Sequence, residues 1–299
     1  MNILITGGTG LIGRSLINAL NTENDQITVL TRDIKKASKL LNANIKLISS
    51  LSLEDIENQD TIINLAGEPI ADKRWSYSQK NKICKSRWDI TEKISTYIQQ
   101  AKNPPSLFIS GSAIGMYGRQ DNDVIDENFQ QFHPEFTHRV CNTWEHFALL
   151  AKSSKTRVAI LRTGIVLAKK GGALAKMLLP FKLGLGGKIS HGKQVMSWIH
   201  IEDVIAAIIF IQNTPTLEGA VNITAPNPVS NQVFTSTLAK VLNRPSLITT
   251  PAFILKVIFG EMADLLLFGQ HVVPNKLQKN GFKFKYPIIE SALSHLIQK

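Results

Sequence analysis

Cysteine is scarce in this sequence, whose 299 residues include only Cys84 and Cys141. Two distant thiols are too few for a disulfide scaffold, and neither lies at the spacing of a metal-binding motif. Histidines and carboxylates do not gather at such a spacing either. We therefore expect a cytoplasmic protein that holds no metal. Neither a basic segment nor a small-residue cleavage site precedes the first apolar run, so we expect no signal peptide.

The chain also lacks a long, uninterrupted hydrophobic run. Its most apolar late stretch, residues 251–268, is broken by Lys256, Glu261 and Asp264. A membrane-spanning helix needs about 20 predominantly apolar residues, so we interpret this stretch as amphipathic helices of the core. The mean hydropathy of the whole chain is +0.00, an ordinary value for a globular protein. We expect no membrane partner.

Acidic residues are outnumbered, with 23 against 34 lysines and arginines, which gives a formal net charge of +11. The basic residues are spread over distant segments, and no nucleic-acid-binding motif accompanies them. A positive surface can attract anionic ligands such as phosphorylated cofactors without binding nucleic acid. We therefore expect no nucleic-acid partner.

The most informative feature that is present lies at the start of the chain. Residues 3–6 form an apolar, β-branched run typical of a buried strand, and residues 11–20 have the apolar spacing of an amphipathic helix. Glycines between them would permit a sharp turn, a close approach to a pyrophosphate and tight packing of helix on strand. The helix start would offer free N–H groups to the phosphates. We predict that a nucleotide binds here, at Gly7, Gly8, Thr9, Gly10, Leu11, Ile12 and Gly13.

The end of the second predicted strand, residues 26–30, bears on the type of nucleotide. In an NAD enzyme, an acidic residue near this point would hold the ribose 2′-hydroxyl. Here Thr31 occupies the aligned position and Arg32 follows it. A guanidinium suits a 2′-phosphate because it offers paired donors. The alternative is that Arg32 is a solvated loop residue and that Asp33 binds the ribose. We favour NADP(H) over NAD(H).

Strand-like and helix-like segments alternate through the first half of the chain. Further strands are expected at residues 45–48, 60–67, 107–110 and 158–161, with helices at 76–102 and 135–153. This alternation predicts an α/β fold with a Rossmann-type, doubly wound parallel sheet in the strand order 3-2-1-4-5-6. Ligands of such sheets bind beyond the carboxyl ends of the strands, where Gly67 and Ser112 also fall.

The character of the sequence changes after Thr163. Glycines and prolines punctuate the rest of the chain, between helical patterns at residues 202–213, 230–242 and 252–268. We expect a dinucleotide-binding domain over residues 1–164. A smaller, mostly helical C-terminal substrate lobe, residues 165–299, is expected to pack on it.

Several phrases of the sequence resemble the extended short-chain dehydrogenase/reductase superfamily. They are GGTGLIG at 7–13, NLAG at 64–67, SGSAIGMYG at 110–118, LRTGIV at 161–166 and WIHIEDV at 198–204. Three longer phrases resemble one atypical branch of that superfamily, the YfcH-like epimerase family. These are AGEPIADKRW at 66–75, LPFKLGLGG at 179–187 and GQHVVP at 269–274.

The resemblance implies a Rossmann-type fold, a bound NADP(H) and a C-terminal substrate lobe. Members of the branch are named epimerases, and some have been labelled cell-division inhibitors, while their reaction is generally unassigned. The matched motifs also imply further cofactor contacts, at Leu65, Ala66, Gly67, Glu68, Arg74, Ser110 and Val166. For Glu68 and Arg74 the alternative is a surface salt bridge.

A working enzyme of the superfamily would use a serine, a tyrosine and a lysine four residues after that tyrosine. The lysine lowers the pKa of the tyrosine's phenol. No tyrosine of this chain has a lysine at that distance, as inspection shows for Tyr77, Tyr97, Tyr117 and Tyr286. Alignment on Glu145 places Thr137 and Cys141 at the two positions, and neither can do the work of that dyad. Ser112 stands at the serine position and Tyr117 follows it, so these two are the candidate catalytic residues; a structural role is the alternative for each.

Two functions are therefore compatible with the sequence. The first is an NADP(H)-dependent oxidoreductase or epimerase that acts on an unknown small molecule. The second is a non-catalytic NADP(H)-binding sensor that contacts a partner such as the division machinery. A sugar-nucleotide epimerase of ordinary mechanism is disfavoured by the missing dyad. We expect a monomer or a homodimer.

Overall fold

The first strand, turn and helix form as their residues predict. The structure is a computed structural model that describes residues 1–20, 25–42, 44–120 and 123–298. Strand β1 (Asn2–Thr6) buries the apolar side chains of Ile3, Leu4 and Ile5 completely. Four residues separate β1 from helix α1 (Leu11–Ala19), whose buried residues include Leu16 and Ile17.

A seven-stranded parallel sheet forms the centre of the molecule, in the order β12-β7-β5-β4-β1-β2-β3. The remaining strands are β2 (Gln26–Leu30), β3 (Lys46–Ile48), β4 (Thr61–Asn64), β5 (Leu107–Ala113), β7 (Arg157–Thr163) and β12 (Gly219–Ile223). Counted along the chain from the β3 edge, the sheet strands run 3-2-1-4-5-6-7. The predicted fold class, an α/β fold with a Rossmann-type parallel sheet, is confirmed.

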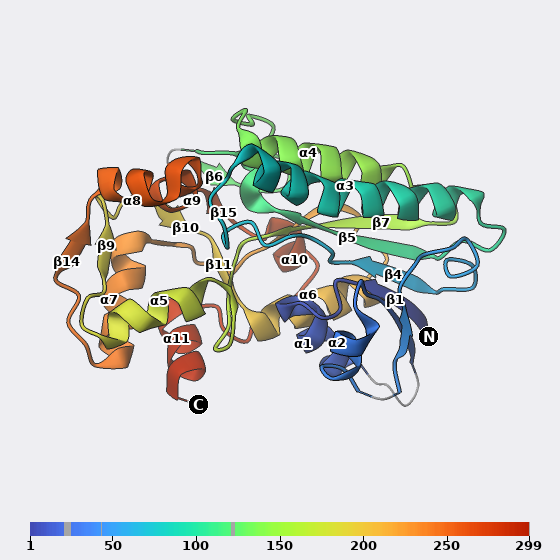
Figure 1. The fold of residues 1–299 in the computed structure, drawn as a ribbon, viewed down its shortest axis with the longest axis horizontal. Coiled ribbons are helices and arrows are strands. Elements are labelled where there is room, and N and C mark those ends of the chain that lie inside the picture. The colour runs from blue at the N-terminus through green and yellow to red at the C-terminus, as the bar shows by residue number, and fades with distance from the viewer. Residues whose placement is uncertain (21–24, 43, 121–122, 299) are drawn as a thin grey trace.

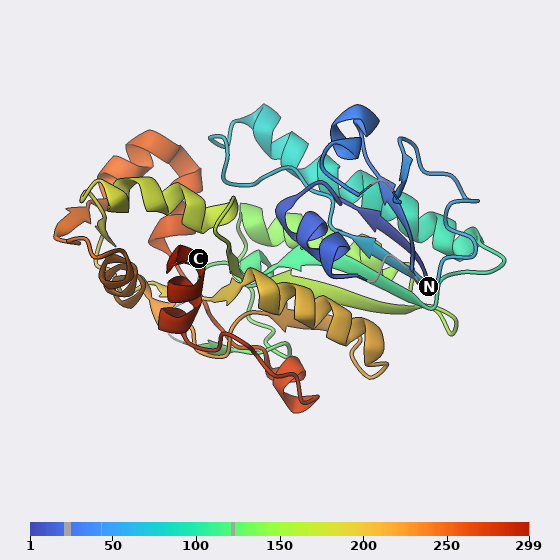
Figure 2. The same cartoon turned by 90° about the horizontal axis from the view of Figure 1, so that it is seen from below.

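Helices cover both faces of the sheet (Figure 1). On one face, α3 (Tyr77–Gln100) and α4 (Phe136–Leu149) pack through residues such as Ile94 and Ala148 onto Leu4, Ile62 and Phe108. On the other face, α1 and α6 (Ile201–Asn213) lie side by side, as Figure 2 shows, and pack on Ile3, Ile5 and Val29. The short helix α2 (Ile34–Ser38) follows β2.

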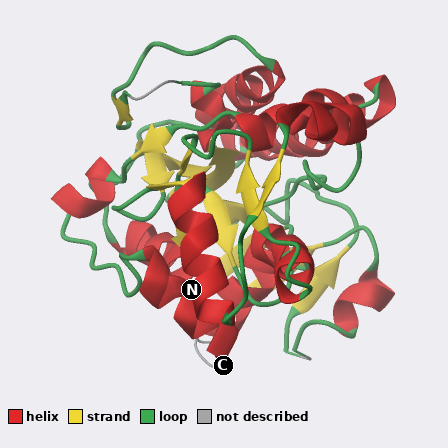
Figure 3. Cartoon of the chain, turned by 90° about the vertical axis from the view of Figure 1, so that its left-hand side faces the viewer, coloured by secondary structure: helices red, strands yellow, loops and turns green. Residues whose placement is uncertain are grey.

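The rest of the chain gathers beyond the carboxyl ends of the strands, on the left of Figure 1, and faces the viewer in Figure 3. Its core includes the buried side chains of Trp198, Phe234 and Leu293. Its helices are α5 (Gly172–Lys182), α7 (Asn231–Leu242), α8 (Ala252–Phe259), α9 (Asp264–Leu267) and α11 (Ile289–Gln298). Helix α10 (Asn275–Lys279) instead packs against the central sheet, next to β12. Short strands pair in twos, namely β8 (Ile165–Leu167) with β11 (Trp198–His200), β9 (Gly187–Ile189) with β14 (Ile248–Thr250), β10 (Val195–Met196) with β13 (Val229–Ser230), and β6 (Val124–Ile125) with β15 (His271–Val272).

Residues 201–223 fall in the segment that the sequence assigns to the C-terminal lobe, yet they return to the sheet. Helix α6 covers one face, and β12 pairs with β7 in register from Gly219 opposite Ala159 to Ile223 opposite Thr163. Strand β12 was not predicted, because a five-residue segment with glycine and asparagine has no recognisable strand pattern. The division of the chain into domains at residue 164 stays a prediction.

The apolar stretch at 251–268 forms the short helices α8 and α9 with a 3₁₀ turn (Gly260–Ala263) between them. Among the described residues, no helix has both the length and the apolar character that a membrane crossing requires.

Candidate functional site

The glycine turn between β1 and α1 has a geometry that only glycine accommodates. Gly7 has a φ of +69°, and a Cβ at this position would lie 2.5 Å from the backbone carbonyl carbon of Leu65. A Cβ at Gly13 would lie 2.4 Å from the Gly7 carbonyl oxygen. No side chain caps the start of α1, where Gly10 is the N-cap residue. The N–H groups of the first turn are therefore left for a ligand, and an anion suits them.

The end of β4 lies directly against this turn. The backbone N–H of Leu65 donates to the carbonyl of Thr6 at 3.1 Å, and the Thr6 hydroxyl donates to Oδ1 of Asn64 at 2.5 Å. Oδ1 of Asn64 also accepts from the backbone N–H of Ala66 at 3.3 Å. The structure thus brings Leu65 and Ala66 beside the glycine turn, where a cofactor contact was predicted.

At the end of β2, the side chains of residues 31–33 differ in whether they have hydrogen-bond partners within the protein. Oδ1 of Asp33 accepts from the backbone N–H of Lys36 at 2.9 Å and so caps α2. The Thr31 hydroxyl accepts from the backbone N–H of Asp33 at 3.3 Å. Arg32 is exposed and bonds to none of the described residues. Because the Asp33 carboxylate already serves as a helix cap, Arg32 is the side chain here that is free to bind a ligand.

Val166 and Ser110 come from two further strands, β8 and β5, and Ser110 pairs with Asn64 of β4. Val166 is in β8, and a Cβ at Gly172, the first residue of α5, would lie 3.2 Å from a methyl of Leu11 and 3.3 Å from the Val166 carbonyl oxygen. Val166 and the start of α5 thus approach the start of α1. Ser110 is 0% exposed and its hydroxyl donates to the carbonyl of Gly111 at 3.3 Å, so its predicted cofactor contact stays a prediction.

The segment after β4, residues 67–76, crosses to the C-terminal lobe. Lys176 of α5 donates to the Ala71 carbonyl at 2.8 Å and to Asp72 at 2.5 Å. Arg74 lies against Gly260, where an added Cβ would be 2.8 Å from its Nε. Gly67 is exposed at the end of β4, and the Glu68 backbone N–H donates to Ser86 Oγ at 2.8 Å. The cofactor contacts of Glu68 and Arg74 stay predictions.

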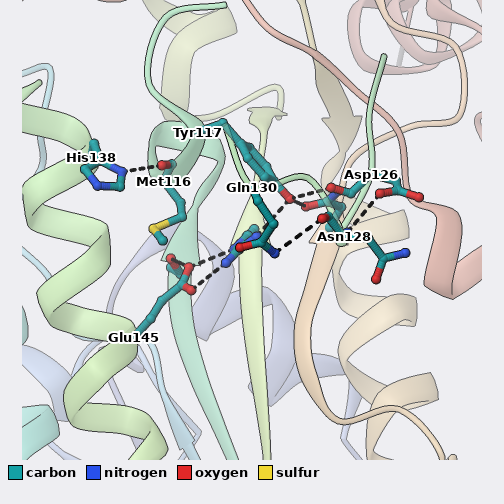
Figure 4. A network of polar contacts seen from close by, with 10 residues as sticks. Met116, Tyr117, Asp126, Asn128, Gln130, His138 and Glu145 are labelled. Atoms are coloured by element: carbon teal, nitrogen blue, oxygen red, sulfur yellow. Dashed lines mark hydrogen bonds and ion pairs between the residues drawn. The ribbon is translucent and has the colours of Figure 1, made fainter. Parts of the chain in front are cut away.

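The two candidate catalytic residues belong to a buried polar network. The Ser112 hydroxyl donates to Oε1 of Glu145 at 2.7 Å. Arg162 donates to both Glu145 oxygens, at 2.9 Å from Nε and 2.8 Å from Nη2, and to the Tyr117 hydroxyl at 3.1 Å. Figure 4 shows Glu145 reaching from its helix towards the centre of this network, below Tyr117. The network joins β5, α4 and β7.

Tyr117 has a full set of partners. Its hydroxyl donates to Oδ1 of Asn222 at 2.7 Å and lies 3.3 Å from the Asp126 carbonyl oxygen (Figure 4). The side chain is 0% exposed, and burial raises its pKa against the opposing charge of Arg162. Burial lowers the pKa of Arg162, but its bonds to Glu145 outweigh burial and leave that pKa raised. The catalytic roles of Ser112 and Tyr117 stay predictions.

The positions aligned with the missing dyad carry no base or cation. The Thr137 hydroxyl donates to Oε1 of Glu135 at 2.6 Å. Burial, and then the charge of Glu145, raise the pKa of Cys141 to about 12. At neutral pH the Cys141 side chain is therefore an uncharged thiol.

A cluster of His200, Glu202 and His295 could not be predicted, because His295 comes from the distant helix α11. Their ligand atoms lie within 4.8 Å of one another, the geometry of a possible cation site. Nδ1 of His200 accepts from the backbone N–H of Glu202 at 3.0 Å, so its proton is on Nε2, which faces Nδ1 of His295 at 3.1 Å. A metal-bound imidazole carries its proton on the nitrogen that does not bind the metal. The hydrogen bonds of His200 therefore weigh against a metal site here.

Comparison with known proteins places the chain among epimerase-like proteins. Residues 3–224 match the family described as "NAD dependent epimerase/dehydratase family", and residues 250–296 match a domain of unknown function, DUF1731. The chain is 37% identical to the Arabidopsis thaliana "Epimerase family protein SDR39U1 homolog, chloroplastic", over 100% of this chain and 87% of that protein. It is 36% identical to an epimerase family protein of Staphylococcus epidermidis, over 99% of this chain and 98% of that protein.

Solved structures are similar over the whole chain. The crystal structure of human epimerase family protein SDR39U1 (isoform 2) with NADPH superposes with a TM-score of 0.90 at 29% identity and covers 100% of both chains. The nucleoside-diphosphate sugar epimerase of Corynebacterium glutamicum has a TM-score of 0.79 at 27% identity, over 99% of this chain and 58% of that one.

Proposed function

The chain belongs to the NAD dependent epimerase/dehydratase family, and on that premise we propose that it binds NADP(H) across the carboxyl ends of β1, β2 and β4. We propose further that it is an oxidoreductase or epimerase of an unknown small molecule that works without the tyrosine–lysine dyad. The human relative whose structure contains NADPH supports the choice of cofactor.

The observation that carries the proposal is the difference between Asp33 and Arg32 at the end of β2. Asp33, the one acid that could hold a ribose 2′-hydroxyl there, is committed to capping α2, while Arg32 is exposed and without a described partner. A guanidinium binds a 2′-phosphate through paired, charge-assisted hydrogen bonds. The site therefore fits a phosphorylated adenosine ribose better than an unphosphorylated one.

The chain's own residues then have separable tasks. The start of α1 binds the pyrophosphate through its backbone N–H groups. Gly7 lets the turn pack against Leu65, and Gly13 lets α1 pack against the turn. Thr31 and Arg32 hold the phosphorylated ribose. Leu65 and Ala66 line the path from the pyrophosphate towards β5. When bound, the nicotinamide supplies hydride transfer.

The buried network favours a second candidate, a non-catalytic NADP(H)-binding sensor. In catalysis, Ser112 and Tyr117 would have to exchange hydrogen bonds or a proton with a substrate. Both hydroxyls instead bond to Glu145, Arg162 and Asn222 within the protein. A substrate that brings its own acid or base, or no substrate at all, is consistent with that arrangement.

The cofactor assignment is tested by Arg32→Asp. We expect the dissociation constant for NADPH to rise roughly tenfold to hundredfold, the value of a charge-assisted hydrogen bond of about 1.5–3 kcal/mol. Binding of NADH should change much less. Isothermal titration of both nucleotides measures the two constants.

Lys35→Asp is the matched control, because it makes the same charge change on the exposed surface of α2. It should leave both dissociation constants within about threefold of the wild type. Equal losses of NADPH and NADH binding in Arg32→Asp would contradict the phosphate assignment.

The enzyme and the sensor are distinguished by two measurements. Mass spectrometry of the denatured protein identifies any dinucleotide or substrate that co-purifies with it. Absorbance at the nicotinamide band then follows hydride transfer from bound NADPH to a panel of metabolites; a protein that never oxidises NADPH fits the sensor.

The predictions of a monomer or homodimer and of a cytoplasmic location are checked by light scattering and by cell fractionation.

A further inference from the structure

One arginine near the proposed cofactor path has donors that the fold does not use. Arg87 lies on α3, and its guanidinium is beside the end of β4, where a Cβ added at Gly67 would be 3.0 Å from Cζ. The guanidinium also lies 5.2 Å from the centroid of the Trp144 ring, which belongs to α4. Arg87 is thus held between two helices, at the carboxyl edge of the sheet.

Only one of the terminal nitrogens of Arg87 is engaged. Nη1 donates to the Ile83 carbonyl at 3.0 Å and lies 3.4 Å from Ser86 Oγ. Nε and Nη2 bond to none of the described residues. A guanidinium has five N–H donors, so the three on these two nitrogens lack an acceptor from the fold.

The charge of Arg87 is likewise uncompensated. Burial lowers its pKa, partly offset by Cys141, Cys84 and Glu68, and no carboxylate among the described residues lies within ion-pair distance of it. A desolvated cation without a counter-charge is costly to keep, and arginine stays protonated in proteins. Such a group is more readily explained as part of a ligand site than as a support for the fold.

The missing side chain at Gly67 leaves this cation accessible. Gly67 is exposed and directly follows Leu65 and Ala66, which lie beside the glycine turn. A ligand that extends from the turn over the end of β4 therefore passes next to the guanidinium. A larger residue at position 67 would stand between the ligand and Arg87.

Arg87 also lies close to helix α4, which carries no lysine at the position of the family's dyad. Cys141 aligns with the dyad lysine and is an uncharged thiol, because burial raises its pKa. Trp144, three residues further along α4, has its ring 5.2 Å from the Arg87 guanidinium. We propose that Arg87 binds the ribose hydroxyls on the nicotinamide side of the dinucleotide and supplies from α3 the cation that position 141 lacks. This proposal rests on the proposed binding of NADP(H).

The test compares the whole dinucleotide with its adenosine half. We would titrate NADPH and adenosine 2′,5′-bisphosphate into the wild type, Arg87→Ala and Arg87→Lys. Arg87→Ala should weaken NADPH roughly tenfold to hundredfold, the range of a charge-assisted hydrogen bond. It should leave the bisphosphate within about twofold, because that fragment ends before Arg87. Arg87→Lys should recover part of the loss.

Lys85→Ala is the control, since it removes one positive charge from the exposed side of the same helix. It should change neither constant by more than about twofold. Unchanged bisphosphate binding also shows that Arg87→Ala is folded.

Two results would overturn the assignment of Arg87 alone. One is NADPH binding in Arg87→Ala equal to that of the wild type, and the other is an equal loss of NADPH and bisphosphate. Failure of the wild type to bind either compound would instead remove the proposed function, and this proposal with it.

Discussion

The carboxyl edge of the sheet has two halves that satisfy their polar groups in opposite ways. At β1, β2 and β4, the N–H groups that begin α1, the Arg32 side chain and three N–H groups of Arg87 find no acceptor among the described residues. At β5, β7 and β12, Ser112, Glu145, Arg162 and Tyr117 bond to one another or to Asn222. The first half leaves these donors without an acceptor from the described residues, whereas the charged and hydroxyl groups of the second bond mainly to one another.

The two candidate catalytic residues, Ser112 and Tyr117, thus lie in the half whose polar side chains bond to one another. Substitutions should separate the two halves, because the first should lose affinity for NADPH and the second should lose stability.

The largest effect is expected at the buried ion pair. Glu145→Gln keeps the shape of the side chain but leaves the Arg162 guanidinium buried without its counter-charge. Breaking a buried pair on one side costs about 3–5 kcal/mol of unfolding free energy. Urea denaturation measures this loss, and NADPH titration of the folded protein should give the wild-type constant.

Glu135→Gln is the matched control, because it makes the same change in the partly exposed pair with Arg119, just before α4. It should cost no more than about 1 kcal/mol. If Glu145→Gln instead abolishes NADPH binding while the protein remains folded, the two halves form one site and the comparison is wrong.

A smaller effect is expected for Tyr117→Phe. The ring, with its edge-on contact to Phe129, is kept, while Arg162 and Asn222 each lose a hydrogen-bond partner. Leaving such groups unsatisfied costs about 1–3 kcal/mol. Thermal and urea unfolding measure the loss, and the NADPH constant should not change.

Tyr97→Phe provides the reference, since the Tyr97 hydroxyl bonds to no described residue. It should shift stability by less than about 0.5 kcal/mol. Should a substrate be found, loss of hydride transfer in Tyr117→Phe at unchanged stability would place Tyr117 among the catalytic residues.

The smallest effect on stability and on NADPH affinity is expected where residues 67–76, after β4, contact the C-terminal lobe. Lys176→Ala removes the ion pair with Asp72, in which both side chains are about half exposed. Exposed pairs contribute about 0–1 kcal/mol, so stability and NADPH affinity should both stay close to the wild type. Lys170→Ala, an exposed lysine just before α5, is the control. A tenfold loss of affinity specific to Lys176→Ala would show that residues 67–76 are a built part of the cofactor site.

The elements β1, α1 and β2 could be predicted from the sequence, because the signal there is local. A strand, three spaced glycines and an amphipathic helix lie within 20 residues, and Arg32 follows the next strand directly. Asp33 as the cap of α2 could have been read from its position before a helix. The competing assignment of Asp33 to the ribose stays a prediction, as does that of Arg32.

The polar network at β5, β7 and β12 could not be predicted, because the side chains that bond to one another come from separate elements. Tyr117 meets Asn222 across 105 positions, and Arg162 reaches Glu145 from a neighbouring strand. Arg87 was missed for another reason: a cation on an amphipathic helix usually points to solvent. Only the contact with Gly67 and Trp144 distinguishes it.

The return of β12 to the sheet has a consequence for how the chain is made. Strand β7 has no partner on its outer side until residue 223 has left the ribosome, and the core under α1 and α6 also includes Leu277 and Phe282. Contacts of such long sequence separation form slowly, and an unpaired parallel strand is prone to aggregate meanwhile. The central sheet, although most of its strands are encoded first, therefore completes its folding only near the end of translation.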